Sequence, residues 1–122
     1  MRKSEQQYRE LIELANSIIV RWKPDGEITF LNEFGQKFFG YAAGQIVGRQ
    51  VVGTIVPETE STGRNLHPLM DQIRADPKAF EQNVNENVRR NGERVWIAWT
   101  NKAILDEQGQ VREVLSIGTD IT

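Results

Sequence analysis

The sequence predicts an α+β fold in which helices cover one face of a five-stranded antiparallel sheet. Strand-like runs fall into two groups, at residues 17–32 and 83–120, and short turn signals join the strands within each group. Residues 32–75, between the two groups, carry apolar side chains at helical spacing. Strands joined by short turns are antiparallel, and helices gathered in one stretch of chain cover one side of the sheet.

The first 16 residues are predicted to form a flanking helix, and residues 17–122 the domain itself. Ser4 and Gln7 have the spacing of a capping box at its start. Leu14 widens its apolar surface, so two interpretations stay open: the helix packs on its own sheet, or it also pairs with a second subunit in a homodimer. The dimerisation candidates are the apolar stripe Tyr8, Leu11, Ile12 and Ala15.

A β-hairpin is predicted next. Residues 17–22 are rich in β-branched and aromatic side chains, and residues 27–32 alternate in character. The turn Pro24-Asp25-Gly26 lies between them, where proline presets φ and glycine supplies a positive φ. Ile28 and Phe30 are expected on the same face of the second strand, because side chains two residues apart share a face.

The middle of the chain predicts several short helices and one longer one. Asn32 can cap a helix that carries three phenylalanines (Phe34, Phe38 and Phe39) and ends at Gly40. Frequent glycines leave room only for single turns over residues 40–57. A longer helix is expected over residues 65–75, ending at Asp76 because Pro77 follows. Its apolar face is Leu66, Leu69, Met70 and Ile73.

Three strands are predicted at the end of the chain. Asn91-Gly92 is a strong hairpin signal of the two-residue type I′ class, and a longer turn is expected at residues 106–109. Trp96 and Trp99 lie three residues apart on the middle strand, so one should face the helices and the other the outer surface. The alternating asparagines of the preceding strand share one face: Asn83, Asn85 and Asn87.

Composition narrows the class of function. A net charge of −2 with mixed signs gives no basic surface for nucleic acid or an anionic membrane. The sequence has no cysteine, which excludes thiolate metal sites and disulfides and fits a cytoplasmic location. No hydrolytic triad, phosphate-binding glycine loop or metalloprotease motif occurs. We therefore expect a binding module rather than an enzyme.

The chain resembles a PAS domain over nearly its whole length. Each matching motif is short, and it is their order and spacing that carry the resemblance. The motifs are Pro24-Asp25-Gly26, Phe39-Gly40-Tyr41, Gly48-Arg49, Arg90-Asn91-Gly92 with Trp96, and Asp120-Ile121-Thr122.

The resemblance implies a sheet with strand order 2-1-5-4-3 and a small cavity walled by the helices. It also implies a sensory or dimerisation role, with the change passed to a C-terminal effector such as a histidine kinase, a diguanylate cyclase or a chemoreceptor. In that motif Asp120 would hold the junction after the last strand, and Thr122 would cap the segment that follows.

Two functions remain open at this point: a sensor that binds a small molecule in the cavity, and a ligand-free relay and dimerisation module with a filled core. A cavity of about 300 Å³ or more would favour the sensor. The pocket candidates combine aromatic and apolar residues with the inward asparagines. They are Phe30, Phe38, Phe39, Leu69, Met70, Ile73, Asn85, Asn87, Trp99 and Asn101.

A flavin is a further alternative that the resemblance raises. Light-sensing members place a cysteine where this chain has Val51, and they contact the flavin with polar side chains at three strand positions. Asn87 matches the first of these, whereas Ile97 and Gly118 stand at the other two. A light sensor that forms a thiol adduct is therefore not expected, and a redox flavin stays open.

Haem is the other cofactor to weigh, because His67 is the single histidine and lies near the helix that supplies a haem ligand in some relatives. On a helical wheel His67 falls beside Asp71 and Arg74 on the polar flank. An exposed histidine is the stronger interpretation. The sequence thus predicts no defined cofactor and no metal site.

Overall fold

The computed structural model describes residues 16–122. The helix predicted over the first 16 residues, with its dimerisation stripe, lies almost wholly outside the described residues. The elements follow one another as β1 (Ile18–Trp22), β2 (Ile28–Leu31), α2 (Glu33–Phe39), α3 (Ala43–Ile46), α4 (Leu69–Ala75), β3 (Gln82–Val88), β4 (Arg94–Leu105) and β5 (Val111–Asp120).

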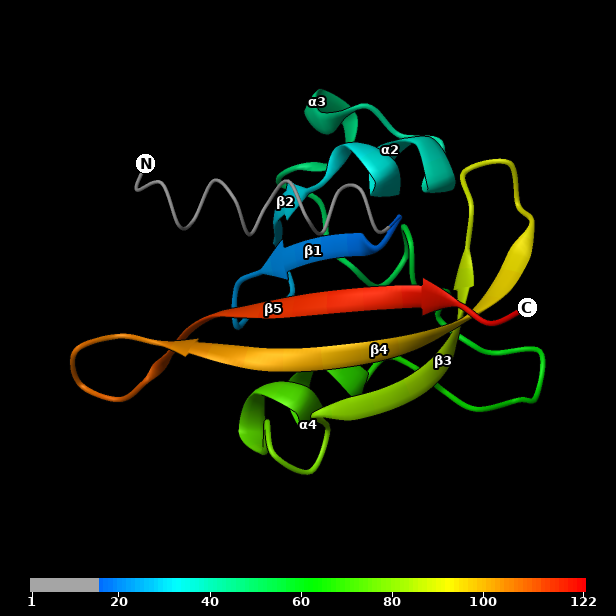
Figure 1. The fold of residues 1–122 in the computed structure, drawn as a ribbon. Helices are drawn as coiled ribbons and strands as arrows, with labels where there is room; N and C mark the ends of the chain where they lie inside the picture. The colour runs from blue at the N-terminus through cyan, green and yellow to red at the C-terminus, as the bar shows by residue number, and fades with distance from the viewer. Residues whose placement is uncertain (1–15) are drawn as a thin grey trace.

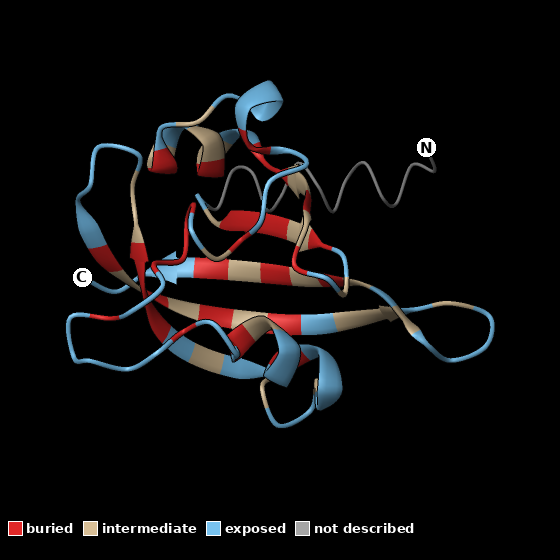
Figure 2. Cartoon of the chain, turned by 180° about the vertical axis from the view of Figure 1, so that it is seen from behind, coloured by how far each residue is buried: buried red, intermediate tan, exposed pale blue. Residues whose placement is uncertain are grey.

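The strands form one antiparallel sheet in the order β2-β1-β5-β4-β3, which confirms the predicted fold. The long strands β4 and β5 cross the middle of the molecule (Figure 1). Strand β1 pairs with β5, which places the first strand of the domain beside its last. The helices and the connecting loops cover one face of the sheet, with α4 in front of β3 and β4 (Figure 2). The hydrophobic core fills the space between these layers.

All three hairpins of the described chain use the same three-residue loop. A backbone N–H···O=C bond of 2.8 Å closes each loop between its flanking residues, which are Lys23 and Glu27, Arg89 and Glu93, and Asp106 and Gln110. The third loop residue is a glycine with φ of 89° at Gly26, 92° at Gly92 and 78° at Gly109. Such a loop is a type I turn followed by one left-handed residue.

The prediction of a two-residue type I′ turn at Asn91-Gly92 is therefore wrong. Of the two residues, only Gly92 has a positive φ. The Asn91 side chain instead accepts a hydrogen bond from the backbone N–H of Glu93 at 2.9 Å, which stabilises an Asx turn. The position of the hairpin was predicted correctly, but its loop is one residue longer than the predicted two-residue turn.

A bulge also corrects the predicted faces of β2. Arg21 pairs with Phe30 and the next residue of β1, Trp22, pairs with Ile28, so Thr29 is the extra residue on β2. An extra residue inverts the alternation of side chains. Ile28 is consequently buried in the core, whereas Phe30 is half-buried on the outer face beside Arg21.

The helix boundaries follow local chemistry. The side-chain carbonyl of Asn32 accepts from the backbone N–H of Gly35 at 3.0 Å and caps α2, and Gly40 ends α2 with φ of 87°, as predicted. Helix α4 begins at Leu69, four residues later than predicted. The residue before a proline avoids the α conformation, and Pro68 therefore delays the start. The end at Asp76 is confirmed.

The two tryptophans of β4 face opposite sides of the sheet, as predicted. Trp99 is buried on the helix side, in line with Val95, Ile97 and Asn101, and Trp96 is half-buried on the outer side. The same alternation places Asn85 and Asn87 of β3 on the buried face. These inward polar residues bring the sheet's amide groups to the cavity described next.

Candidate functional site

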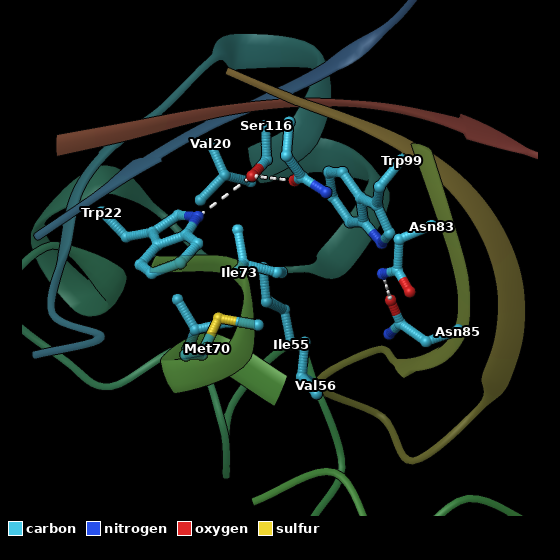
Figure 3. Close-up of a pocket in the computed structure, with 12 residues that line it drawn as sticks. Val20, Trp22, Ile55, Val56, Met70, Ile73, Asn83, Asn85, Trp99 and Ser116 are labelled. Carbon is cyan, nitrogen blue, oxygen red and sulfur yellow. Dashed lines mark hydrogen bonds between the residues drawn. The ribbon is translucent and has the colours of Figure 1, made fainter. Parts of the chain in front are cut away.

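A small cavity lies between the sheet and α4 (Figure 3). Its volume is about 20 Å³, which is room for about one water molecule. Five of the ten predicted pocket residues line it: Met70, Ile73, Asn85, Trp99 and Asn101. Their proximity is a finding, and their role in binding a ligand stays a prediction.

The other predicted pocket residues lie elsewhere. Leu69 and Phe39 are core residues away from the cavity lining, and Asn87 lies just behind the lining, fully buried. Phe38 packs under the guanidinium of Arg89, with 4.8 Å from Cζ to the ring centroid. Phe30 is on the outer face for the reason given above. The aromatic residues expected to wall the cavity thus mostly stabilise the fold.

Seven lining residues were not predicted: Val20, Trp22, Val51, Ile55, Val56, Asn83 and Ser116. Strand alternation could have found Val20 and Trp22, which share the buried face of β1, and Asn83, which shares a face with Asn85. The loop residues, such as Ile55, carry no periodic signal. Their position depends on the tertiary path of the chain.

One hydrogen-bond chain crosses three strands above the cavity (Figure 3). The indole N–H of Trp22 donates to the Ser116 hydroxyl at 3.0 Å, and that hydroxyl donates to the Asn101 carbonyl at 2.7 Å. The Asn101 amide then donates to the backbone carbonyl of Phe80 at 2.8 Å. An indole N–H only donates and a backbone carbonyl only accepts, so the direction of the whole chain is set.

A second chain runs along β3. The Asn83 amide donates to the Asn85 carbonyl at 2.8 Å, and the Asn85 amide donates to the Asn87 carbonyl at 3.2 Å. Asn87 also accepts from the Trp99 indole at 3.1 Å and donates to the backbone carbonyl of Ile55 at 2.9 Å. These bonds offset the cost of burying the amides.

The cavity lining is uncharged, and the nearest buried carboxylate on β3 points to the other face. Glu86 accepts hydrogen bonds from the Ser61 hydroxyl at 2.9 Å and the Arg94 guanidinium at 2.8 Å. Burial raises the pKa of the Glu86 carboxyl, but the hydrogen bonds from Arg94 and Ser61 and the charge of Arg94 together lower it below its usual value. The backbone N–H of Glu86 also donates to Glu60 at 3.0 Å, so this cluster ties the loop before α4 to the edge of the sheet.

The residues present do not fit haem or a flavin in this conformation. His67 lies in the turn before α4, exposed, with Nε2 3.5 Å from Oε1 of Glu58, and it does not line the cavity. A ring system such as isoalloxazine exceeds about 20 Å³ many times over, and the Asn87 amide is already hydrogen-bonded to Trp99 and Ile55.

Over residues 16–122 no cluster of three metal-ligating side chains occurs. No helix in that range is long and apolar enough to cross a membrane.

The end of the chain folds back onto β4. The Asp120 carboxylate accepts from the Thr122 backbone N–H at 2.9 Å, and the Thr122 hydroxyl accepts from the Trp96 backbone N–H at 2.8 Å. The Ile121 N–H donates to the Trp96 carbonyl at 2.9 Å. These contacts attach the exit of the last strand to the sheet, and the predicted relay role of Asp120 and Thr122 stays a prediction.

A five-stranded antiparallel sheet with short helices over one face and a small cavity beneath them is the arrangement that the resemblance to a PAS domain implies. The chain belongs to the PAS family, because the family model for the PAS fold matches residues 6–121. The domain is thus a PAS sensory domain.

Similar proteins agree with this assignment. A PAS domain from Colwellia psychrerythraea has a TM-score of 0.75 and 19% identity, over 98% of each chain. The PAS domain of the Cronobacter turicensis quorum-sensing receptor RpfR, solved in complex with C12:0, has a TM-score of 0.67 and 19% identity, over 88% of this chain and 95% of that one. The two-component sensor PprA of Pseudomonas aeruginosa is 27% identical over 98% of this chain, which spans 12% of that protein's length.

Proposed function

We propose that this domain binds a small molecule in the cavity under the sheet and passes the change to an effector in a longer signalling protein. The observation that carries the proposal is the wall of buried amides and a hydroxyl at the cavity, from Asn85, Asn101 and Ser116. A core that served packing alone would be filled more cheaply by apolar side chains, since buried polar groups must all be satisfied.

Helix α4 supports the proposal as a wall that can move. It has seven residues and buries only Leu69 and Ile73, and Pro68 and Pro77 bracket it. Few buried contacts give a segment a low free energy of local opening. Displacement of α4 would enlarge the cavity of about 20 Å³ toward the range of about 300 Å³ that small ligands occupy.

A ligand-free relay module is the second candidate. The small cavity of about 20 Å³ favours it, because the Trp22–Ser116–Asn101 chain is complete without a guest. In this alternative the domain would dimerise through the segment before β1 and transmit changes made elsewhere.

The relatives support a place in a larger protein. PprA is a two-component sensor of which the chain spans 12%, so an effector such as a histidine kinase would lie outside this chain. The complex of the RpfR domain with C12:0 supports ligand binding in a similar fold. We further propose that the domain is a cytoplasmic homodimer, in which removal of residues 1–15 would lower the dimer fraction.

Native mass spectrometry of the freshly purified domain, with an absorbance spectrum of the same sample, tests the proposal. We expect a bound small molecule in wild type and none in Ile73→Phe, which fills the cavity. Overpacking costs about 1–3 kcal/mol, so thermal unfolding must show that the variant is folded. The relay would be supported instead if the measured mass equals that of the polypeptide alone and no compound of a metabolite library raises the unfolding temperature.

A further inference from the structure

The absence of charged side chains from the cavity lining restricts which molecules can bind there. None of its twelve lining residues carries a charged side chain. The carboxylate of Glu86 points to the opposite face of β3, where Arg94 and Ser61 hold it. A buried ionic group without a partner is strongly disfavoured. The cavity therefore selects against a carboxylate or an ammonium group.

The orientation of the amides can be followed from one end of the β3 chain to the other. The backbone carbonyls of Ile55 and Glu86 can only accept, so they bind the amide nitrogens of Asn87 and Asn85 at 2.9 Å each. The carbonyl of Asn85 is thereby left to face Asn83, which must donate its own amide nitrogen to it at 2.8 Å.

The chain therefore ends in a hydrogen-bond acceptor at the cavity. The side-chain carbonyl of Asn83 accepts no hydrogen bond from residues 16–122, and Asn83 is half-buried in the lining (Figure 3). The indole N–H groups of Trp22 and Trp99 and the Ser116 hydroxyl are already donated to neighbours. The Asn83 side chain thus offers an open acceptor oxygen in this wall, beside the second N–H of the same amide.

We propose that the ligand is an uncharged molecule with an N–H or O–H donor, such as a primary amide or an alcohol, and that Asn83 recognises the donor. This inference rests on the proposed ligand-binding function and specifies its ligand class. A molecule of the same shape that lacks the donor would leave the Asn83 carbonyl desolvated and unpaired, which lowers its affinity.

Three probes of nearly equal size separate charge from donor capacity: propanamide, butanone and propionate. Each is titrated into the ¹⁵N-labelled domain, and the indole N–H signals of Trp22 and Trp99 report on the cavity. The indole of Trp96, on the outer face, is the internal control. We expect propanamide to shift the two cavity signals saturably and to bind about five- to ten-fold more tightly than butanone, with propionate weaker still.

A variant assigns the preference to one residue. Asn83→Leu keeps the approximate shape and removes the acceptor, so it should bind propanamide and butanone equally, while Gln82→Leu, one residue away and exposed, should keep the preference. Equal binding of all three probes to wild type, or a preference for propionate, would overturn the inference and leave ligand binding standing. If no probe moves the Trp22 and Trp99 signals, the inference fails, and the native mass spectrum decides the proposed function separately.

Discussion

The indole ring of Trp99 on β4 lies directly over Gly118 on β5. The two residues pair across the strands, and a Cβ placed on Gly118 would stand 2.7 Å from two ring atoms of Trp99. Trp99 also lines the cavity, and Gly118 lies two residues before Asp120 at the strand exit. A guest that moved the indole would therefore act on the last strand directly.

Replacement of Gly118 tests this packing. Gly118→Ala should lower the free energy of unfolding by about 1–3 kcal/mol, because the new methyl group overlaps the Trp99 ring. Urea denaturation measures the change. Gly44→Ala is the matched control: nothing lies within 4 Å of its Cβ, and alanine is favoured in a helix such as α3, so stability should hold or rise. Equal stabilities for the wild type and Gly118→Ala would refute the contact.

The Trp22–Ser116–Asn101 chain predicts a coupling between its members. Ser116→Ala leaves the buried Trp22 indole and the Asn101 carbonyl without their partner and should cost about 1–3 kcal/mol of unfolding free energy. Adding Trp22→Phe should cost less in this background than in wild type, because the donor no longer has an acceptor. A double-mutant cycle in urea gives the coupling, and strictly additive effects would contradict the chain.

The Glu86 cluster predicts a pH dependence with a definite sign. Its pKa in the folded domain is below the usual 4.5. The stabilisation by the Glu86 carboxylate is thus complete above pH 4.5 and is lost as the pH falls through the lower, folded-state pKa. Glu86→Gln should be less stable than wild type at pH 7, by about 1 kcal/mol or more. The gap should close in acid.

Urea midpoints measured from pH 7 down to pH 3 check this expectation. The exposed Glu107→Gln serves as the control and should follow the wild-type profile throughout. A constant gap between Glu86→Gln and wild type at every pH would show that lost packing, and not ionisation, explains the effect.

The junction at Asp120 predicts a separation of folding from output. Asp120→Ala removes the acceptor for the exposed Thr122 N–H and should change stability by less than about 1 kcal/mol. In the intact parent protein the same change should uncouple the effector from the domain, which an assay of effector output would show. Asp106→Ala, at the far β4–β5 turn, controls for loss of a turn carboxylate. Normal regulation in Asp120→Ala would rule out the junction role.

The sequence predicted the features that depend on period and turn chemistry. Alternation along β4 placed Trp96 and Trp99 on opposite faces, and the Asn32 and Gly40 caps of α2 were correct. The bulge at Thr29 was not predictable, since a single extra residue leaves the local pattern unchanged while it inverts the face of Phe30.

Only part of the cavity lining was predicted, because local sequence patterns assign some of its residues and not others. Strand residues such as Asn85 and Trp99 have a face that alternation assigns, whereas Val51, Ile55 and Val56 reach the cavity from an irregular loop. The cavity volume depends on how side chains from distant segments fit together. No local pattern encodes that fit.

The most direct test of the central claim asks whether the cavity opens. Because the sequence has no cysteine, a single substitution to cysteine gives a protein with one thiol, placed on the buried face of the sheet. Val20 lines the cavity and is 2% exposed, whereas Val114 on β5 is 0% exposed and lies outside the cavity lining. The two variants to compare are Val20→Cys and Val114→Cys. Reaction with a thiol reagent under native conditions measures the opening at each site.

A domain that admits a ligand by displacement of α4 should react much faster at Val20→Cys than at Val114→Cys, whose rate reports global unfolding. Equal slow rates at both positions, matching the unfolding rate of each variant, would show a core that opens only on unfolding and would contradict ligand binding in this cavity.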